Sequence, residues 1–346
     1  MKKILLALIF LIGMFSTGFS QGTAIYTVFV NIVPEEFNMP LIGFVNIAKG
    51  NHSMPQIGFV NWNTGDFSSL QMGFVNTTGN NSNGVQFGFL NTSAGDKDGV
   101  QFGFLNTVAR SAEGFQFGFV NAVANDTKGL QFGFVNTSAG DIKGMQFGFV
   151  NAATKSGEGF QCGFINTATH KLAGVQLGFL NHADSVENGI PIGLFSIVRH
   201  GGYRAFEYSF SEFFPLNIQF KLGVEKFYTN FIVAYNSFNE IDPKQIITGL
   251  GIGSIFSLSN YLFINPELNS LYSLFSDENN LWLSLTPFFG FNINKNFSIT
   301  LGPSITWLHA FSNTELQKPS FNIMENIIDE NNNIVIGAKA CVRFRF

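Results

Sequence analysis

A four-residue motif, Gly-Phe-Val-Asn or a close variant, recurs every fifteen residues through about half of the chain. No insertion or deletion interrupts this period. Fifteen residues before the first glycine of the series, Val28 takes the same place ahead of Phe29. A strict period means that each repeat contacts the next in the same way, so the motif restricts the fold more than any other feature. The glycines of the motif are Gly43, Gly58, Gly73, Gly88, Gly103, Gly118, Gly133, Gly148, Gly163, Gly178 and Gly193.

Each repeat combines a strand pattern with a turn pattern, as residues 84–98 illustrate. In the first half, Val85, Phe87 and Phe89 alternate with residues such as Gln86. A period of two with aromatic and β-branched side chains is typical of a β-strand. The second half is rich in small and polar residues, which favour turns. We therefore expect one strand and one turn in each repeat.

Two architectures fit such a repeat. In a β-solenoid each repeat is one coil, and equivalent positions stack about 4.8 Å apart. In an antiparallel meander, successive turns fall on two different edges, so the loops should vary with a thirty-residue period. No such modulation is visible, because residues 96–98 and 111–113 have the same polar character. We therefore expect a solenoid; the alternative is a meander that joins the C-terminal strands in one large barrel.

The solenoid interpretation also predicts which side chains face inward. We expect the phenylalanines to stack as internal columns and the glutamines to form an exposed amide ladder, so that Phe119 is a core residue and Gln116 is not. Proline-containing repeats at both ends, with Pro34 and Pro191, are expected to cap the stack. The expected columns are Phe89, Phe104, Phe119, Phe134, Phe149 and Phe164, then Phe87, Phe102, Phe117, Phe132 and Phe147, with asparagine ladders from Asn31 to Asn181.

The first twenty residues have the features of a secretory signal peptide. Two lysines precede an apolar stretch over residues 4–15, and Gly18 and Ser20 supply small residues before a cleavage site at Gln21. The apolar stretch is too short for a stable membrane span. We therefore expect a signal peptide at residues 1–20 and a repeat domain at residues 21–200.

Residues 201–346 are expected to form a separate antiparallel barrel domain. The fifteen-residue period stops there, but polar and apolar residues still alternate. Strands of nine to fourteen residues with one apolar face suit an outer-membrane barrel, while a soluble β-sandwich is the alternative. The eight expected strands are 204–213, 217–225, 227–235, 245–257, 260–274, 280–293, 296–309 and 332–346.

The last of these strands carries the clearest membrane signal. An apolar series of alternate residues ends at Phe344 and Phe346, whereas Lys339, Arg343 and Arg345 lie on the opposite face. A terminal aromatic residue on the apolar face is typical of bacterial outer-membrane barrels. We expect the cationic residues to face a narrow lumen that side chains fill.

The sequence contains no pattern that we assign to catalysis, a cofactor or a metal. The five histidines fall on unrelated positions, and Cys162 and Cys341 are expected to be isolated apolar fillers rather than a disulfide. The glycine-rich stretch at 249–253 lies in a strand pattern, which indicates a crowded barrel interior rather than a phosphate loop. Aspartates of the repeat turns are too irregular for a calcium-binding solenoid. The net charge of −4 argues against a nucleic-acid partner.

The tandem motif, followed by residues 191–195 and by Ala205-Phe206-Glu207-Tyr208-Ser209, resembles uncharacterised surface-repeat proteins of Bacteroidota-type bacteria. The resemblance covers nearly the whole mature chain. It implies an envelope location, with outer-membrane lipid as a partner, and it implies no activity and no functional residue.

These features support three hypotheses about function. The first is a non-enzymatic surface protein in which a membrane-anchored barrel carries a repeat rod for adhesion, scaffolding or envelope architecture, with an unknown glycan or protein ligand. The second is a pore or transport barrel. The third is a polysaccharide-acting β-helix enzyme, which would need a cluster of carboxylates along one face of the solenoid.

Overall fold

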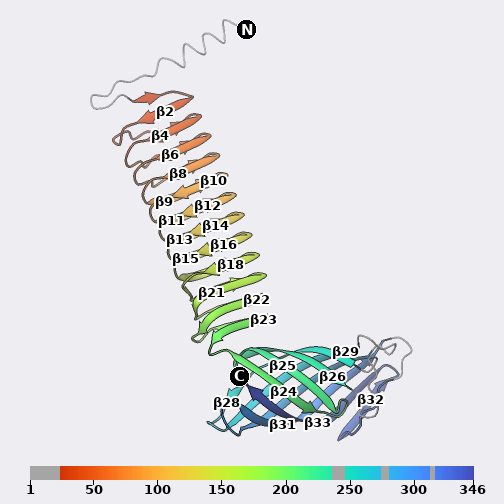
Figure 1. The fold of residues 1–346 in the computed structure, drawn as a ribbon. Helices are drawn as coiled ribbons and strands as arrows, with labels where there is room; N and C mark the ends of the chain where they lie inside the picture. The colour runs from red at the N-terminus through yellow and green to blue at the C-terminus, as the bar shows by residue number, and fades with distance from the viewer. Residues whose placement is uncertain (1–23, 236–245, 274–279, 312–315) are drawn as a thin grey trace. The chain divides into compact units, whose positions relative to one another are not determined.

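The computed structural model describes residues 24–235, 246–273, 280–311 and 316–346, and the expected signal peptide lies outside them. Every regular element of the described residues is a β-strand (Figure 1). The chain divides into two compact units. The first extends to Gly178 and includes Glu187–Gly189, and the second contains Phe179–Val186 and Ile190–Phe346. The first unit is a β-solenoid, and the second contains a closed antiparallel β-barrel.

Each coil of the solenoid contributes two short strands that pair in parallel with the same strands of the neighbouring coils. In one coil these are β9 (Ser82–Phe87) and β10 (Leu90–Ser93). β9 pairs with the equivalent strand fifteen residues later, Gln86 opposite Gln101, and β10 pairs with its own equivalent in the same way. Parallel pairing at a constant offset confirms the solenoid and excludes the meander. The expectation of one strand per repeat was wrong, because the chain turns a corner at Gly88.

The remaining strands of the solenoid repeat this arrangement. The series equivalent to β9 comprises β3 (Leu41–Ile42), β5 (Gln56–Ile57), β7 (Leu70–Met72), β11 (Lys97–Phe102), β13 (Ala112–Phe117), β15 (Thr127–Phe132), β17 (Ile142–Phe147) and the pair β19 (Ser156–Gly157) and β20 (Phe160–Cys162). The series equivalent to β10 comprises β2 (Val30–Val33), β4 (Val45–Ala48), β6 (Val60–Asn63), β8 (Val75–Thr78), β12 (Leu105–Val108), β14 (Val120–Val123), β16 (Val135–Ser138), β18 (Val150–Ala153) and β21 (Ile165–Leu172). β1 (Ile25–Tyr26) pairs antiparallel with β2.

The glycine of the motif is required by the close approach of successive coils at this corner. A Cβ atom built on Gly103 would lie 2.3 Å from the carbonyl oxygen of Gly88, and one on Gly118 would lie 2.4 Å from that of Gly103. Both distances are far shorter than van der Waals contact. The expectation that these glycines admit a neighbouring backbone is confirmed.

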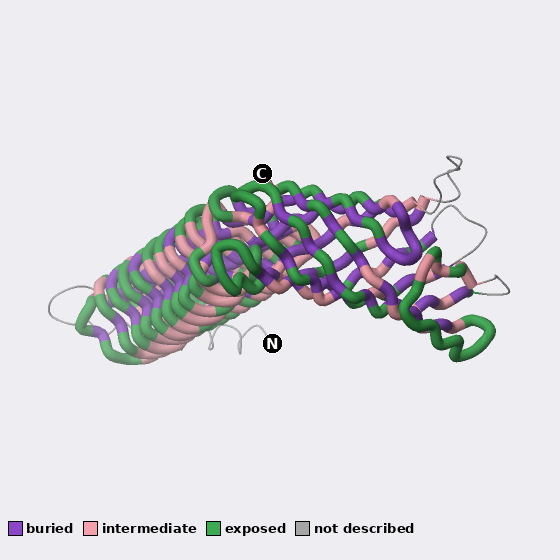
Figure 2. The backbone as a smooth tube through the Cα atoms, turned by 90° about the horizontal axis from the view of Figure 1, so that it is seen from below, coloured by how far each residue is buried: buried purple, intermediate pink, exposed green. Residues whose placement is uncertain are grey.

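The amide side chains, and not the phenylalanines, fill the interior beside this corner. The Nε2 atom of Gln101 donates to Oε1 of Gln86 at 2.7 Å, and Gln116 donates to Gln101 at the same distance. All three glutamines are at most 3% exposed, whereas Phe119 is 47% exposed. The alternating burial is visible along the coils in Figure 2. The predicted internal phenylalanine columns and exposed glutamine ladder were therefore wrong.

The corner explains this inversion. It separates β9 from β10, so Gln86 and Asn91 both point into the thin coil, while Phe87 and Phe89 stay on its outer surface. Inside, each amide finds an identical partner one coil away, which satisfies its donor and acceptor. The asparagines do the same: Asn91 Nδ2 donates to Asn106 Oδ1 at 2.8 Å and to the Phe102 carbonyl at 2.8 Å.

The N-terminal coils have a different interior. Val33, Phe37, Leu41 and Ala48 form an apolar cluster, and Tyr26 packs against it. This cluster replaces the glutamine ladder at the first coils, as expected for a capping structure.

The second unit contains the eight predicted strands, and their boundaries agree with the prediction to within a few residues. They are β24 (Tyr203–Phe210), β25 (Leu216–Val224), β26 (Phe227–Tyr235), β27 (Ile246–Gly253), β29 (Leu262–Ser273), β30 (Asn280–Asn292), β31 (Phe297–Ala310) and β33 (Asn332–Arg345). Sequential neighbours pair antiparallel, and β24 pairs with β33, which closes the barrel. Two short strands, β28 (Phe256–Ser257) and β32 (Met324–Asp329), lie beside β29 and β33.

Two long strands precede the barrel, β22 (Val175–Val186) and β23 (Ile190–His200). β23 packs on the outside of β25 and β26. The Phe195 and Phe231 rings stack with centroids 5.3 Å apart, and the Thr229 hydroxyl donates to the Gly193 carbonyl at 2.6 Å. Gly201, with φ of 73°, then turns the chain into β24.

Candidate functional surfaces

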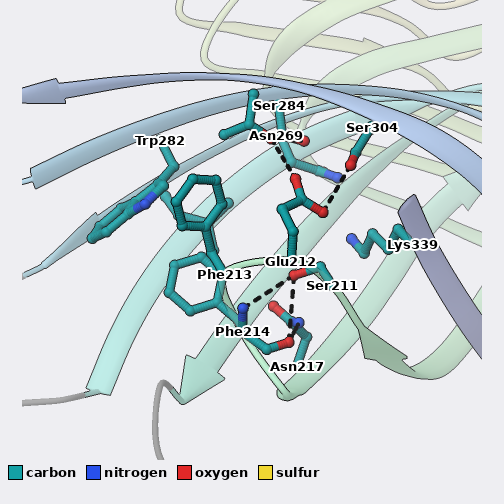
Figure 3. Close-up of a pocket in the computed structure, with 12 residues that line it drawn as sticks. Ser211, Glu212, Phe213, Phe214, Asn217, Asn269, Trp282, Ser284, Ser304 and Lys339 are labelled. Atoms are coloured by element: carbon teal, nitrogen blue, oxygen red, sulfur yellow. Dashed lines mark hydrogen bonds between the residues drawn. The ribbon is translucent and has the colours of Figure 1, made fainter. Parts of the chain in front are cut away.

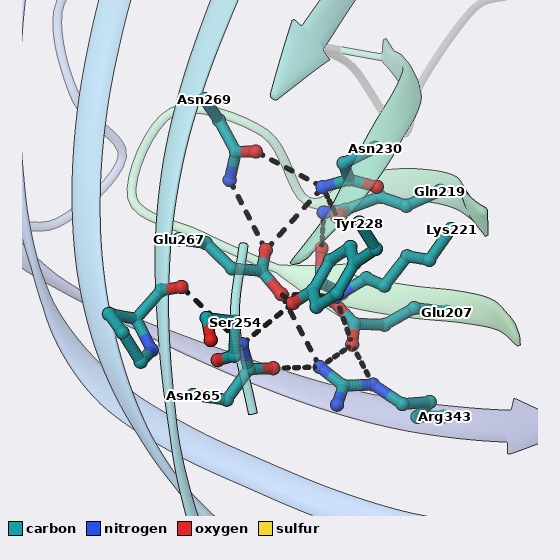
Figure 4. Close-up of polar contacts among 12 residues, drawn as sticks. Glu207, Gln219, Lys221, Tyr228, Asn230, Ser254, Asn265, Glu267, Asn269 and Arg343 are labelled. Carbon is teal, nitrogen blue, oxygen red and sulfur yellow. Dashed lines mark hydrogen bonds and ion pairs between the residues drawn. The ribbon is translucent and has the colours of Figure 1, made fainter. Parts of the chain in front are cut away.

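Four charged side chains form one network in the barrel interior and neutralise one another. Lys221 contacts the carboxylates of both Glu207 and Glu267, with Nζ 2.8 Å from Glu207 Oε2. Arg343 donates from Nε to Glu207 at 2.7 Å and from a terminal nitrogen to the Asn265 side chain at 2.6 Å. Figure 4 shows these side chains and their contacts. All four charged side chains are completely buried.

Neutral polar side chains extend this network across the lumen. The Tyr228 hydroxyl donates to Glu267 at 2.7 Å, and Asn230 donates to Gln219 at 2.6 Å and to Asn269 at 3.1 Å. Two carboxylates and two cations give the cluster no net charge. Buried charges persist only when they are paired and hydrogen-bonded in this way, so the arrangement fits a structural filling of the lumen.

A short connection blocks the barrel at the end where β24 finishes. Residues 211–214, between β24 and β25, fold inward, and the Glu212 carboxylate accepts hydrogen bonds from Ser304 at 2.7 Å and Thr306 at 2.9 Å. Phe213 and Phe214 join an apolar cluster with Trp282 (Figure 3). The cavity that remains beside them measures about 20 Å³, which is room for about one water molecule.

The outer wall of the barrel is apolar. Outward positions on the eight strands carry one charged residue among the described residues, Arg204, at the start of β24. Aromatic residues lie towards both strand ends, with Tyr235 and Trp307 at one end and Phe291 and Phe344 at the other. Exposed outward side chains include Phe206, Ile218, Val233, Leu250, Leu268, Leu285, Phe289, Ile299, Leu301, Ile305 and Val342. The barrel thus has a polar inside and an apolar outside.

The solenoid carries a continuous row of exposed rings along one corner, here called the aromatic stripe. Neighbouring rings are parallel to within 1–5°, and their centroids lie 4.9–5.0 Å apart. Each ring is 43–58% exposed. The stripe consists of Phe44, Phe59, Phe74, Phe89, Phe104, Phe119, Phe134, Phe149 and Phe164.

The opposite corner of the coil is polar, and its aspartates have structural roles. Asp96 accepts a hydrogen bond from the Ser111 amide at 3.0 Å, and Asp126 accepts one from the Asp141 amide at 2.8 Å. Each carboxylate therefore ties one coil to the next. No group of three or more His, Cys, Asp or Glu residues that could hold a metal ion occurs among the described residues.

Near this corner a single lysine enters the solenoid interior. Lys97 is 2% exposed, and Nζ donates to the carbonyls of Ser82, Gly84 and Asp98. Burial lowers the pKa of this ammonium to about 8, against a smaller opposite effect of Asp98. Threonine takes the equivalent place two coils later, at Thr127.

The other residues singled out from the sequence do not form a site. Cys162 and Cys341 are free. His52 is buried in the solenoid, where desolvation lowers its pKa, and His309 contacts Asn332 on the barrel. The glycines at 249–253 do face a crowded lumen, as predicted, because a Cβ on Gly251 would lie 1.9 Å from the Asn269 side chain.

Sequence reasoning placed Lys339 and Arg343 in the lumen correctly but missed the other three charged residues of the network. Lys221 and Glu267 are each the only charged residue of their strand, and Glu207 lies between apolar or aromatic neighbours in β24; that pattern could have identified them. Which of them meet depends on the closure of the barrel, since β24 and β33 lie at opposite ends of its sequence.

No helix long and apolar enough to cross a membrane occurs in the described part of the chain. Comparison of the sequence and structure with family models, curated proteins and solved structures found no match. The resemblance to surface-repeat proteins therefore stays a prediction.

Proposed function

We propose that this chain is a non-enzymatic protein of the outer cell envelope, in which the barrel is an outer-membrane anchor and the solenoid is a repeat rod with a scaffolding role. The observation that carries the proposal is the polarity of the barrel. A soluble barrel buries apolar side chains, whereas here Glu207, Lys221, Glu267 and Arg343 are buried and the exposed wall is apolar. Lipid is the surrounding that satisfies such a wall.

The filled lumen favours an anchor over a pore. The charge network occupies one level of the lumen, and Glu212, Phe213 and Phe214 occupy another. Small eight-stranded barrels have interiors just wide enough for side chains. An open channel would require that several buried ion pairs separate, at a cost of several kcal/mol.

The surface of the solenoid favours a structural role over catalysis. Asp96 and Asp126 accept backbone hydrogen bonds from the next coil, and the opposite corner is aromatic. A glycosidase needs a pair of carboxylates free to act on the glycosidic bond. The turn aspartates instead hold coils together.

The connections between barrel strands favour a periplasmic position for the rod. At the end where β24 begins, the strands are joined by residues 225–226, 254–261 and 293–296, while the other end carries longer connections such as 236–245 and 311–331. Outer-membrane barrels have short periplasmic turns and longer external loops. The chain that leads into β24 would thus arrive from the periplasm, which favours envelope architecture over adhesion.

Fractionation of cells that express the full chain tests the anchor. We expect the native protein in the outer-membrane fraction, resistant to carbonate extraction. Ala340→Arg, on the apolar wall, should impair assembly by about 2–4 kcal/mol if it lies near the midplane. Ala109→Arg, on the polar corner of the solenoid, is the matched control and should assemble normally. Recovery of the native protein without detergent would overturn the proposal.

The position of the rod is tested by labelling a cysteine at Ala109 in a Cys162→Ser background. A membrane-impermeant maleimide should label it only after the outer membrane is permeabilised. Labelling of intact cells would place the rod outside and restore the adhesion hypothesis. Conductance of planar bilayers that contain the native protein should stay at baseline.

A further inference from the structure

The aromatic stripe exposes a large apolar area along one corner of the solenoid. A phenylalanine side chain offers about 150–250 Å², so nine rings at about half exposure leave roughly 800 Å² uncovered. The flanking column adds further apolar area, with Ile57, Met72, Phe87 and Phe102 each exposed by 38% or more. Contiguous apolar patches of this size mark interaction sites.

The geometry of the rings restricts what can bind. Because neighbouring rings such as Phe104 and Phe119 are parallel and 5.0 Å apart, each ring face is covered by the next ring. Sugars and nucleobases stack on open aromatic faces, and the stripe presents only ring edges. The stripe is therefore suited to an apolar partner that packs against edges.

The stripe also carries no charge that would select an ionic partner. Its own column is phenylalanine throughout, and the next column along β10 and its equivalents is valine, leucine or isoleucine, from Val45 to Ile165. The nearest charged column, which includes Asp98, Glu113, Lys128 and Lys143, contains both signs and lies four residues before the flanking residues in each coil.

We infer that the stripe pairs with the stripe of a second copy of this chain, the two solenoids lying side by side and parallel. This inference rests on the proposed anchor, which puts both rods on the same side of one membrane. An interface of standard size buries about 800 Å² on each partner, which the stripe alone supplies. Both stripes have the same 4.9–5.0 Å spacing, so along two parallel rods each ring edge of one copy meets the equivalent ring edge of the other.

The parallel arrangement also avoids a clash of charges. A two-fold axis along the rods places the charged column of one copy opposite the outward residues of β10 and its equivalents on the other. On the coils that carry these charges the facing residues are small and uncharged, namely Thr92, Thr107, Ala122, Thr137 and Ala152. Self-association through the stripe is thus compatible with both flanks of the surface.

Mass measurement of the full chain in detergent tests the inference. Native protein should have the mass of a dimer by light scattering after correction for detergent, and Phe104→Asp with Phe119→Asp should be monomeric. Ala109→Asp with Ala124→Asp adds the same charge at the opposite corner and should stay dimeric. The far-UV circular dichroism of all variants should match, and a third variant, Phe104→Leu, keeps the surface apolar and should stay dimeric.

A second measurement separates the competing occupants. A cysteine at Phe104 in a Cys162→Ser background should form an intermolecular disulfide in native membranes under mild oxidation, and one at Ala109 should not. A monomeric native protein whose Phe104→Trp fluorescence is quenched by brominated lipids would overturn the inference in favour of lipid. A monomer without quenching would overturn it as well. Membrane fractionation of the same samples reports separately whether the anchor itself has failed.

Discussion

The solenoid and the barrel both bury polar side chains and expose apolar ones, but they satisfy the buried groups differently. In the solenoid, neutral amides such as Gln101 and Asn106 bond to identical residues fifteen positions away. In the barrel, charged groups far apart in the sequence meet, as Arg343 and Glu207 do. In a repeated coil each buried polar side chain can bond to the identical side chain of the next coil. In a barrel without repeats, different side chains must be brought together.

The two exposed apolar surfaces differ as well. The wall of the barrel surrounds a filled lumen on all sides, which suits a lipid surrounding. The aromatic stripe follows one corner of the solenoid, and the opposite corner is polar, with Asp96 and Asp126. A one-sided apolar row suits a partner that approaches from one direction.

The solenoid differs from the barrel most strongly in its constant fifteen-residue register, and deletions can test how far folding depends on that register. Removal of residues 99–113 takes out one complete coil and should leave the solenoid folded, because Asp98 then precedes Gly114 in the same register. Removal of residues 99–105 from the same place should abolish folding, since Gln101 is lost and the coils on the two sides of the deletion no longer meet in register. Protease resistance of the full chain measures both, and equal loss from the two deletions would contradict stacking.

A single substitution in the barrel network should destabilise the protein more than any single substitution in the solenoid. Arg343→Met leaves Glu207 and Glu267 with one cation between them, Lys221, and should destabilise the barrel by about 3–5 kcal/mol. Arg345→Met is the control, because Arg345 pairs with the exposed Glu225, and such pairs contribute about 0–1 kcal/mol. Urea midpoints in detergent compare the variants. Similar midpoints for both would mean that the buried network does not hold the barrel.

Within the solenoid, the loss of a buried glutamine can be compared directly with the loss of an exposed phenylalanine. Gln116→Ala removes the donor to Gln101 Oε1 and the acceptor of Gln131 Nε2, and should cost roughly 2–4 kcal/mol, since each buried polar group that loses its partner costs about 1–3 kcal/mol. Phe119→Ala removes a half-exposed ring that stacks on two neighbours and should cost roughly 1–2 kcal/mol. Chemical denaturation followed by circular dichroism gives the order, and a larger cost for Phe119→Ala would contradict the buried amide ladder.

The effect of the one charge buried inside the solenoid, that of Lys97, should depend on pH. Burial lowers the pKa of Lys97 from 10.5 to about 8, so the folded chain holds this proton less tightly than the unfolded chain. The buried ammonium therefore lowers the free energy of unfolding below pH 8, and this loss disappears as the pH rises towards 10.5. Lys97→Thr should stabilise the protein by about 1–3 kcal/mol at pH 7 and by little at pH 10.5. The exposed Lys128→Thr should show no such difference in unfolding midpoints.

How much of this structure followed from the sequence depends on the kind of pattern. The constant fifteen-residue period predicted parallel stacking, because a solenoid tolerates no change of register. In the barrel, alternation together with Lys339 and Arg343 predicted both the strands and their inward faces, since the charged residues mark the face opposite to the apolar one. These patterns are local, so they can be recognised within a single strand without knowledge of its neighbours.

The orientation of the repeat and the partners in the barrel were decided only by the tertiary structure. Alternation separates Gln116 from Phe119 but does not say which is inside, and hydrophobicity alone suggested the wrong answer. The corner at each motif glycine turns both amides inward, where the neighbouring coils satisfy them, and that contact exists only once the coils stack. In the same way, Glu207 meets Arg343 only when β24 closes on β33. Sequence periodicity thus determined the repeat and its register, while contacts between distant segments determined which polar groups could be buried.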